Sequence, residues 1–275
     1  MDGNIEYGKP PVVERVASLY ADIPEELFEG RFEDWRNLVA QHFPVYEPLK
    51  QWKLGFQNKG DPKEPIPILI SSQPELIITP RFSRRLSREG FDWSIRCPRG
   101  QFTMNMHPDP SDGSARRYAQ LRYEFISWAE RWMEHFEVRT IKLLTLHYVN
   151  ALNMGTVPSF FSKDGLSLAL PDIINVFMNV ARPGEIIVPP FVCHANIQFP
   201  DKENASFSLQ VQDSSSSPQA VGVNVNFIVT VQPVPEESSI QKITELLDWA
   251  HYRILERFEY VFSERAKQSF EPVKK

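Results

Sequence analysis

Strict alternation of apolar and polar residues in five short segments is the feature that most constrains this chain. The segments span 91–97, 101–106, 191–199, 206–212 and 221–231. In 221–231, every second residue is Val or Phe. An alternation of period two places apolar side chains on one face of a strand and polar side chains on the other. The five segments therefore predict half-buried antiparallel strands.

Two longer segments have the spacing of amphipathic helices. Between about 115 and 136, large apolar residues recur at intervals of three and four, as in Leu121, Phe125 and Trp128. A second helix is predicted from about 239 to 266, with Ser238 as its N-cap and Gln241 completing a capping box. Each helix follows a set of alternating strands and is expected to pack on their apolar face.

The fold class predicted from this order is α+β, with two similar halves that each contain an antiparallel sheet and one long helix on one face. The expected N-terminal half is 1–153, the linker is 154–172, where periodicity is lost, and the C-terminal half is 173–275. An N-terminal strand is expected at 11–20 and a helical region near 25–42.

Composition excludes several classes of function. The 275 residues carry a net charge of −5, which gives the whole protein little attraction for nucleic acid or membranes. The N-terminal residues lack the pattern of a signal peptide, and no window reaches 18 apolar residues, so a cytoplasmic protein without a membrane partner is expected. Cys97 and Cys193 lack metal or redox spacing, and free thiols, no metal and no cofactor are predicted. Because no phosphate loop, zinc-binding or serine-elbow motif occurs, no catalytic residue is predicted.

Polar residues within apolar segments are assigned structural roles. In "TIKLLTLHYVNALN" (140–153), alternation sends His147 and Asn150 to opposite faces of a strand, which argues against a shared catalytic task. Tyr148 and Asn150 are expected to hydrogen-bond to neighbouring groups, because buried polar groups need partners. His251 falls within the apolar arc of the last helix and is predicted to be a hydrogen-bonded core histidine.

Arginine is concentrated in residues 81–122. Nine arginines against four acidic residues give this segment a net charge of +5, so the remainder of the chain carries −10. Arginine suits bidentate contacts with phosphate or carboxylate. The candidates for nucleic-acid or anion binding are Arg81, Arg84, Arg85, Arg88, Arg96 and Arg99. The alternative is a solvated surface, or pairing with the acidic remainder of the same chain.

Two other surfaces are candidates for binding. The outward faces of the alternating strands carry amides and hydroxyls more than Lys or Glu, as in Ser94, Asn105 and Asn226, and could form a hydrogen-bonding surface. The last helix carries Trp249, Arg253 and Tyr260 outside its core stripe, and such residues are enriched at protein interfaces. A contact between the two halves would explain these three residues equally well.

The order of three motifs resembles that of a sporadically distributed family of prokaryotic proteins with uncharacterised function. The motifs are a Pro-Pro-x-Val-Glu strand, a mid-chain Leu-x-Tyr-x-Asn strand and a closing helix with Ala-His and an aromatic residue. They are matched here by Pro10, Pro11, Val13 and Glu14, by Leu146, Tyr148 and Asn150, and by Ala250, His251 and Phe258. His147 stands where the family more often has Arg. The resemblance implies an accessory or genome-defence context and supplies no catalytic residues.

Three hypotheses about function follow. The leading one is a non-catalytic binding or assembly module of a prokaryotic accessory system, acting through a protein partner or as a homo-oligomer. The first alternative is a nucleic-acid-binding module that uses the Arg-rich segment 81–122. The second is an enzyme with a site between the two halves.

Overall fold

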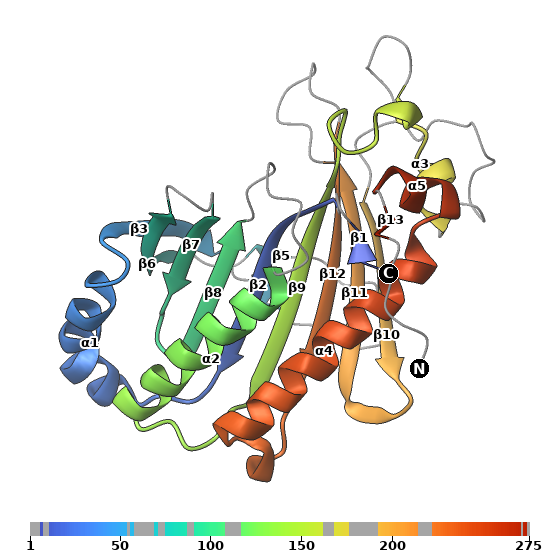
Figure 1. The fold of residues 1–275 in the computed structure, drawn as a ribbon. Coiled ribbons are helices and arrows are strands. Elements are labelled where there is room, and N and C mark those ends of the chain that lie inside the picture. The colour runs from blue at the N-terminus through green and yellow to red at the C-terminus, as the bar shows by residue number, and fades with distance from the viewer. Residues whose placement is uncertain are drawn as a thin grey trace.

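A computed structural model shows a mixed α and β fold built on one large antiparallel sheet (Figure 1). The described residues are 6–7, 11–53, 56–57, 69–70, 75–86, 91–107, 117–161, 168–175, 192–213, 222–270 and 272–273. No helix within these ranges is long and apolar enough to cross a membrane.

Within the described residues, the sheet contains nine strands in the order β10-β11-β12-β9-β2-β8-β7-β6-β3, and every neighbouring pair is antiparallel. Their bounds are β2 (Val12–Tyr20), β3 (Val45–Lys53), β6 (Glu75–Leu86), β7 (Phe91–Arg96), β8 (Gln101–His107), β9 (Leu143–Leu152), β10 (Val192–Phe199), β11 (Lys202–Asp213) and β12 (Val223–Val231). The predicted alternating segments are confirmed as β7, β8, β10, β11 and β12. Two small sheets pair β1 (Glu6–Tyr7) with β13 (Pro272–Val273), and β4 (Phe56–Gln57) with β5 (Leu69–Ile70).

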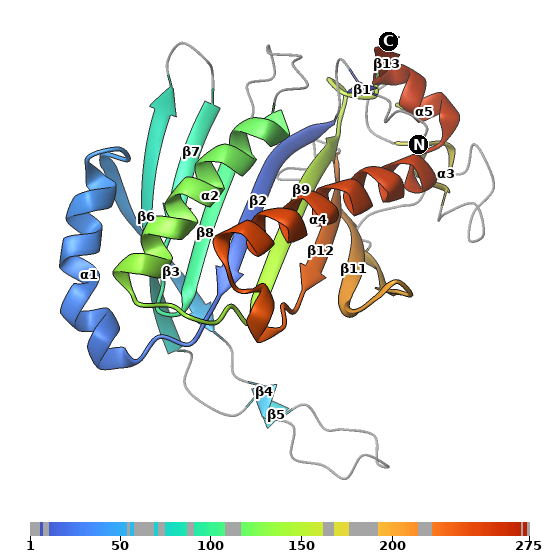
Figure 2. The same ribbon diagram turned by 60° about the horizontal axis from the view of Figure 1, so that its bottom comes forward.

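In the part of the chain that the structure describes, three long helices cover one face of this sheet (Figures 1 and 2). They are α1 (Glu25–Ala40), α2 (Arg117–His135) and α4 (Ile240–Val261). Shorter elements are η1 (Pro158–Phe160), α3 (Leu170–Ile173), η3 (Pro235–Glu237) and α5 (Glu264–Ser269). Apolar side chains from the sheet and the helices meet in one layer, where Phe102 of β8 packs against Phe125 and Trp132 of α2. This layer buries the apolar half of each alternating strand.

The second long helix departs from its prediction at both ends. Ser239 rather than Ser238 is the N-cap of α4, and its side chain accepts a hydrogen bond from the Lys242 amide at 3.3 Å. The Ser238 hydroxyl instead accepts a bond from the Ile141 amide at 2.9 Å. The predicted continuous helix breaks after Val261, and Ser263 caps the separate helix α5.

β9 lies in the interior of the sheet, between β2 and β12. Its even-numbered residues are buried on the helix side, and its odd-numbered residues are half-buried on the other side. His147 and Asn150 therefore point to opposite faces, as alternation predicts. The strands of the two expected sheets form one continuous sheet, because β9 pairs with β2 on one side and with β12 on the other.

Candidate functional site

The face of the sheet turned away from the helices carries polar side chains from six adjacent strands. Strand register places these residues next to one another. We call this surface the polar face, and its central residues are Glu14, Ser18, Arg81, Ser94, Arg96, Thr103, Asn105, His107, His147 and Asn226. Ser18, Ser94 and Thr103 are buried at its centre, so this is not an ordinary solvated sheet face.

Short hydroxyl side chains at the centre of the polar face bond to one another. The Thr103 hydroxyl donates to the Ser18 hydroxyl at 2.9 Å. The Gln101 amide donates to Thr103 Oγ1 at 2.8 Å and to the Tyr20 hydroxyl at 3.2 Å. Because these groups satisfy one another, they hold the polar face in a fixed arrangement.

A charged chain crosses β7, β8 and β2. Arg96 Nη2 donates to Asn105 Oδ1 at 3.1 Å, and Asn105 Nδ2 donates to Glu14 Oε1. His107 Nε2 lies 3.4 Å from the same Glu14 oxygen. Asn105 therefore links a cation to an anion, and the contacts on both sides fix the orientation of its amide.

Arg81 lies directly opposite Arg96 in the register of β6 and β7. Like charges in this position destabilise a sheet. Burial lowers the pKa of Arg96, Glu14 raises it, and Arg81 lowers it further. Within the described ranges, Arg81 has no hydrogen bond or ion pair, and the buried Arg96 Nε has no acceptor. On the other side of β6, Glu47 of β3 lies directly opposite Arg81 in register, while the charge of Glu14 acts on Arg96. The two guanidinium groups therefore adjoin each other between two carboxylates that come from β3 and β2.

His147 extends the polar face across β9. Its Nε2 lies 3.2 Å from Asn226 Oδ1 of β12. Burial lowers the pKa of His147, while the bond to Asn226 and the charge of Glu14 raise it and Arg96 lowers it. A neutral imidazole in this position can donate a hydrogen bond to a ligand or accept one from it. The described residues contain no group of three or more His, Cys, Asp or Glu side chains that could hold a metal ion.

A second polar network lies on the opposite, helix-covered side of the sheet. The Tyr148 hydroxyl is 2.8 Å from His251 Nδ1, and the Tyr118 ring stacks on the His251 ring with centroids 3.6 Å apart. Tyr118 donates to Asp248 at 2.7 Å, and Arg122 binds both oxygens of the same carboxylate at 2.7 and 2.9 Å. These contacts join β9, α4 and α2.

Burial decides the ionisation of this network. Burial, with a smaller contribution from the charge of Arg15, lowers the pKa of His251 to about 3. Burial also raises the pKa of Tyr148 to about 12. The histidine is therefore neutral at physiological pH. Asn150, the third predicted structural residue, donates to the Val225 carbonyl at 2.9 Å.

The candidate arginines have separate environments. Arg84 pairs with Glu124 at 2.9 Å and lies over the Phe43 ring on the helix side. Arg99 pairs with Glu25. Arg88 and the side chain of Arg85 lie outside the described residues. Of the four arginines whose side chains are described, only Arg81 and Arg96 share the polar face.

The three candidate partner-binding residues on α4 also differ in their surroundings. The Trp249 ring packs edge-on against Phe199 at 5.0 Å, and the Arg253 guanidinium lies 5.3 Å from the Trp249 ring. Arg253 also pairs with Asp201 and with Glu256. Trp249 and Arg253 therefore contact the β10–β11 hairpin of the same chain, while Tyr260 is 66% exposed.

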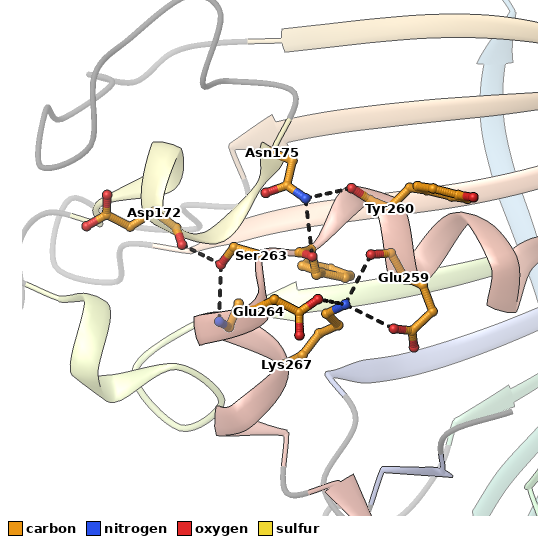
Figure 3. A network of polar contacts seen from close by, with 9 residues as sticks. Asp172, Asn175, Glu259, Tyr260, Ser263, Glu264 and Lys267 are labelled. Carbon is orange, nitrogen blue, oxygen red and sulfur yellow. Dashed lines mark hydrogen bonds and ion pairs between the residues drawn. The ribbon is translucent and has the colours of Figure 1, made fainter. Parts of the chain in front are cut away.

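A polar network that the sequence patterns did not indicate joins α3, α5 and the end of α4 (Figure 3). The buried Lys267 ammonium contacts Glu259 Oε2 at 3.0 Å and also contacts Glu264. The Ser263 hydroxyl donates to the Asp172 carbonyl at 2.6 Å, and Asn175 donates to the Tyr260 carbonyl at 2.7 Å. The ion pair at 259 and 267 spans the helix break, so helical spacing alone could not predict it.

Comparison with known proteins supplies no further assignment: no family model, no curated protein and no solved structure matches this chain.

Proposed function

We propose that this protein is a binding module that holds an acidic segment of a protein partner on its polar face. The observation that carries the proposal is the pair Arg81 and Arg96, two arginines directly opposite each other in the register of β6 and β7. A carboxylate bound between the two guanidinium groups would offset their repulsion, in the bidentate geometry that arginine favours.

Other features of the polar face favour an extended polypeptide over nucleic acid. The polar face also carries amide and hydroxyl side chains, from Asn105 beside Arg96 to Asn226 on β12 at the far side of the face, and such groups match the donors and acceptors of a peptide backbone. Single-stranded nucleic acid needs aromatic platforms, but Trp93 is buried on the helix side of β7. Arg84 and Arg99 are engaged by carboxylates of the same chain.

The proposal includes an architecture of two similar halves. In sheet order, β2, β8, β7 and β6 stand on one side of the centre, and β9, β12, β11 and β10 stand on the other. In the first set, the strands β6, β7 and β8 follow one another along the chain and lead into α2. In the second set, β10, β11 and β12 do the same and lead into α4. The polar face would then span the junction of the halves. The resemblance to sporadically distributed prokaryotic proteins supports a role in an accessory system such as genome defence.

Isothermal titration calorimetry with poly-L-glutamate at low salt tests this function. We expect binding by the unmodified protein and at least a tenfold weaker affinity for Arg81→Gln and for Arg96→Gln. Arg99→Gln is the matched control, because it removes an equal charge from an exposed hairpin turn and should lose little affinity. The proposal is wrong if poly-L-glutamate does not bind, or if all three variants bind alike. Tighter, salt-sensitive binding of a single-stranded oligonucleotide would favour the nucleic-acid alternative instead.

A further inference from the structure

β10 is an edge strand of the large sheet (Figure 1). Among the described strands, only β11 pairs with it. The side chains of His194, Asn196 and Gln198 are exposed on the polar side, and Ile197 is 41% exposed on the helix side. An edge strand presents unpaired backbone N–H and C=O groups, which can pair with another strand.

The two edges of the sheet differ in how they resist such pairing. β10, with the sequence VCHANIQF, contains no Lys, Arg, Asp, Glu, Pro or Gly. β3, at the opposite edge, contains Glu47, Pro48, Lys50 and Lys53. Charged residues and proline are the usual devices that prevent edge-to-edge association. The chain therefore has one protected edge and one edge that is competent for pairing.

We propose that β10 pairs antiparallel with β10 of a second copy of this chain, which forms a two-fold symmetric dimer with one continuous sheet. With the axis at Asn196, that residue lies opposite its own copy, His194 lies opposite Gln198, and Ala195 lies opposite Ile197. Amides then meet amides or imidazole, apolar side chains meet each other, and no formal charges are juxtaposed. The exposed Ile197 gains an apolar neighbour.

A second copy fits this edge better than a strand from another protein. β10 has no charge pattern with which to select a foreign sequence, whereas its residues complement themselves about Asn196. An isologous contact uses the same edge of both chains and closes the assembly. Because β3 is protected, growth stops at two copies.

Charge substitutions at the proposed axis test the dimer. Asn196→Lys and Asn196→Glu each place like charges opposite each other, and light scattering after size-exclusion chromatography should show half the mass of the unmodified protein. A mixture of the two variants should restore the dimer, because opposite charges then meet at the axis. Val45→Lys, at an exposed position on β3, is the matched control and should remain dimeric.

Circular dichroism first establishes that all variants are folded, and the masses then decide whether the dimer forms through β10. A monomeric unmodified protein, or a dimer that persists in both Asn196 variants, overturns the proposal. Failure of the mixture to dimerise also overturns it, because pairing at Asn196 requires complementation. Binding of poly-L-glutamate involves Arg81 and Arg96 and is measured separately, so the two proposals can fail independently.

Discussion

His251 shows how the surroundings of one residue determine its chemistry. Its ring lies between Tyr118 and Tyr148, with Nδ1 2.8 Å from the Tyr148 hydroxyl. Burial, together with the charge of Arg15, lowers its pKa to about 3, so it stays neutral while an unfolded histidine becomes charged. Alternation and helical spacing predicted the faces of Tyr148 and His251, but their contact depends on how α4 packs on β9.

Lowering the pH from 7 to 5 should reduce the free energy of unfolding by about 2 kcal/mol through His251. The unfolded histidine, with an ordinary pKa of about 6.5, binds a proton in this range and the folded one does not. The stability is therefore present above pH 6.5 and is lost progressively as the pH falls toward 3. Urea denaturation at both pH values measures the change. His251→Asn should reduce the pH dependence, and an unaltered dependence would contradict the assignment.

Tyr148→Phe should lower the free energy of unfolding by about 1 to 2 kcal/mol at pH 7, because His251 Nδ1 loses its buried hydrogen-bond partner. Tyr252→Phe is the matched control, since Tyr252 is 52% exposed on the same helix as His251. Chemical denaturation compares the two variants. Equal stabilities would show that the hydroxyl of Tyr148 has no such role.

The Glu14, Asn105 and Arg96 chain could not be predicted from the sequence. These residues come from β2, β8 and β7, and sequence alternation predicts the face of each side chain but not which strands are neighbours. The outward position of Asn105 was predicted. Their contact with Glu14 requires β2 to pair with β8, which is a pairing between distant segments.

At the scale of elements, strand prediction succeeded where alternation was clean. It failed for β3 and for most of β6, which contain Pro48 and Pro80 and lack a clear alternation. The last helix shows a second limit. Helical spacing continues through Phe262 and Ser263, although the chain leaves helical geometry there and Ser263 caps α5.

Across the helix break, Lys267 joins α5 to the end of α4 through its contact with Glu259 (Figure 3). Lys267→Ala should destabilise the protein by about 2 kcal/mol, because it removes charge-assisted bonds from a largely buried site. Lys242→Ala is the matched control, since Lys242 forms an exposed pair with Glu245 within α4 and should have no measurable effect. Thermal unfolding checks both variants, and an equal effect of the two would contradict this role.

At the scale of the whole molecule, the sheet continues across the predicted boundary at residue 153. β9 belongs to the predicted N-terminal half, and it pairs along its length with β12 of the predicted C-terminal half. Loss of periodicity predicted a linker at 154–172, but periodicity does not report pairing between the strands on either side of it.

Because β9 and β12 share a ladder, we expect one cooperative unfolding transition. Tryptophan fluorescence and far-ultraviolet circular dichroism should give the same denaturation midpoint. Five of the six tryptophans lie before residue 153, so fluorescence mainly reports the first half. Two separate midpoints would show that the halves unfold independently.

The most direct test of the central claim is to observe the side chains of Arg81 and Arg96 during ligand binding. In nitrogen-15 NMR spectra, titration with poly-L-glutamate should shift the guanidinium resonances of both residues and leave those of Arg99 nearly unchanged. Shifts confined to Arg99 and other exposed cations, with Arg81 and Arg96 unaffected, would contradict the proposal that the polar face binds an acidic partner.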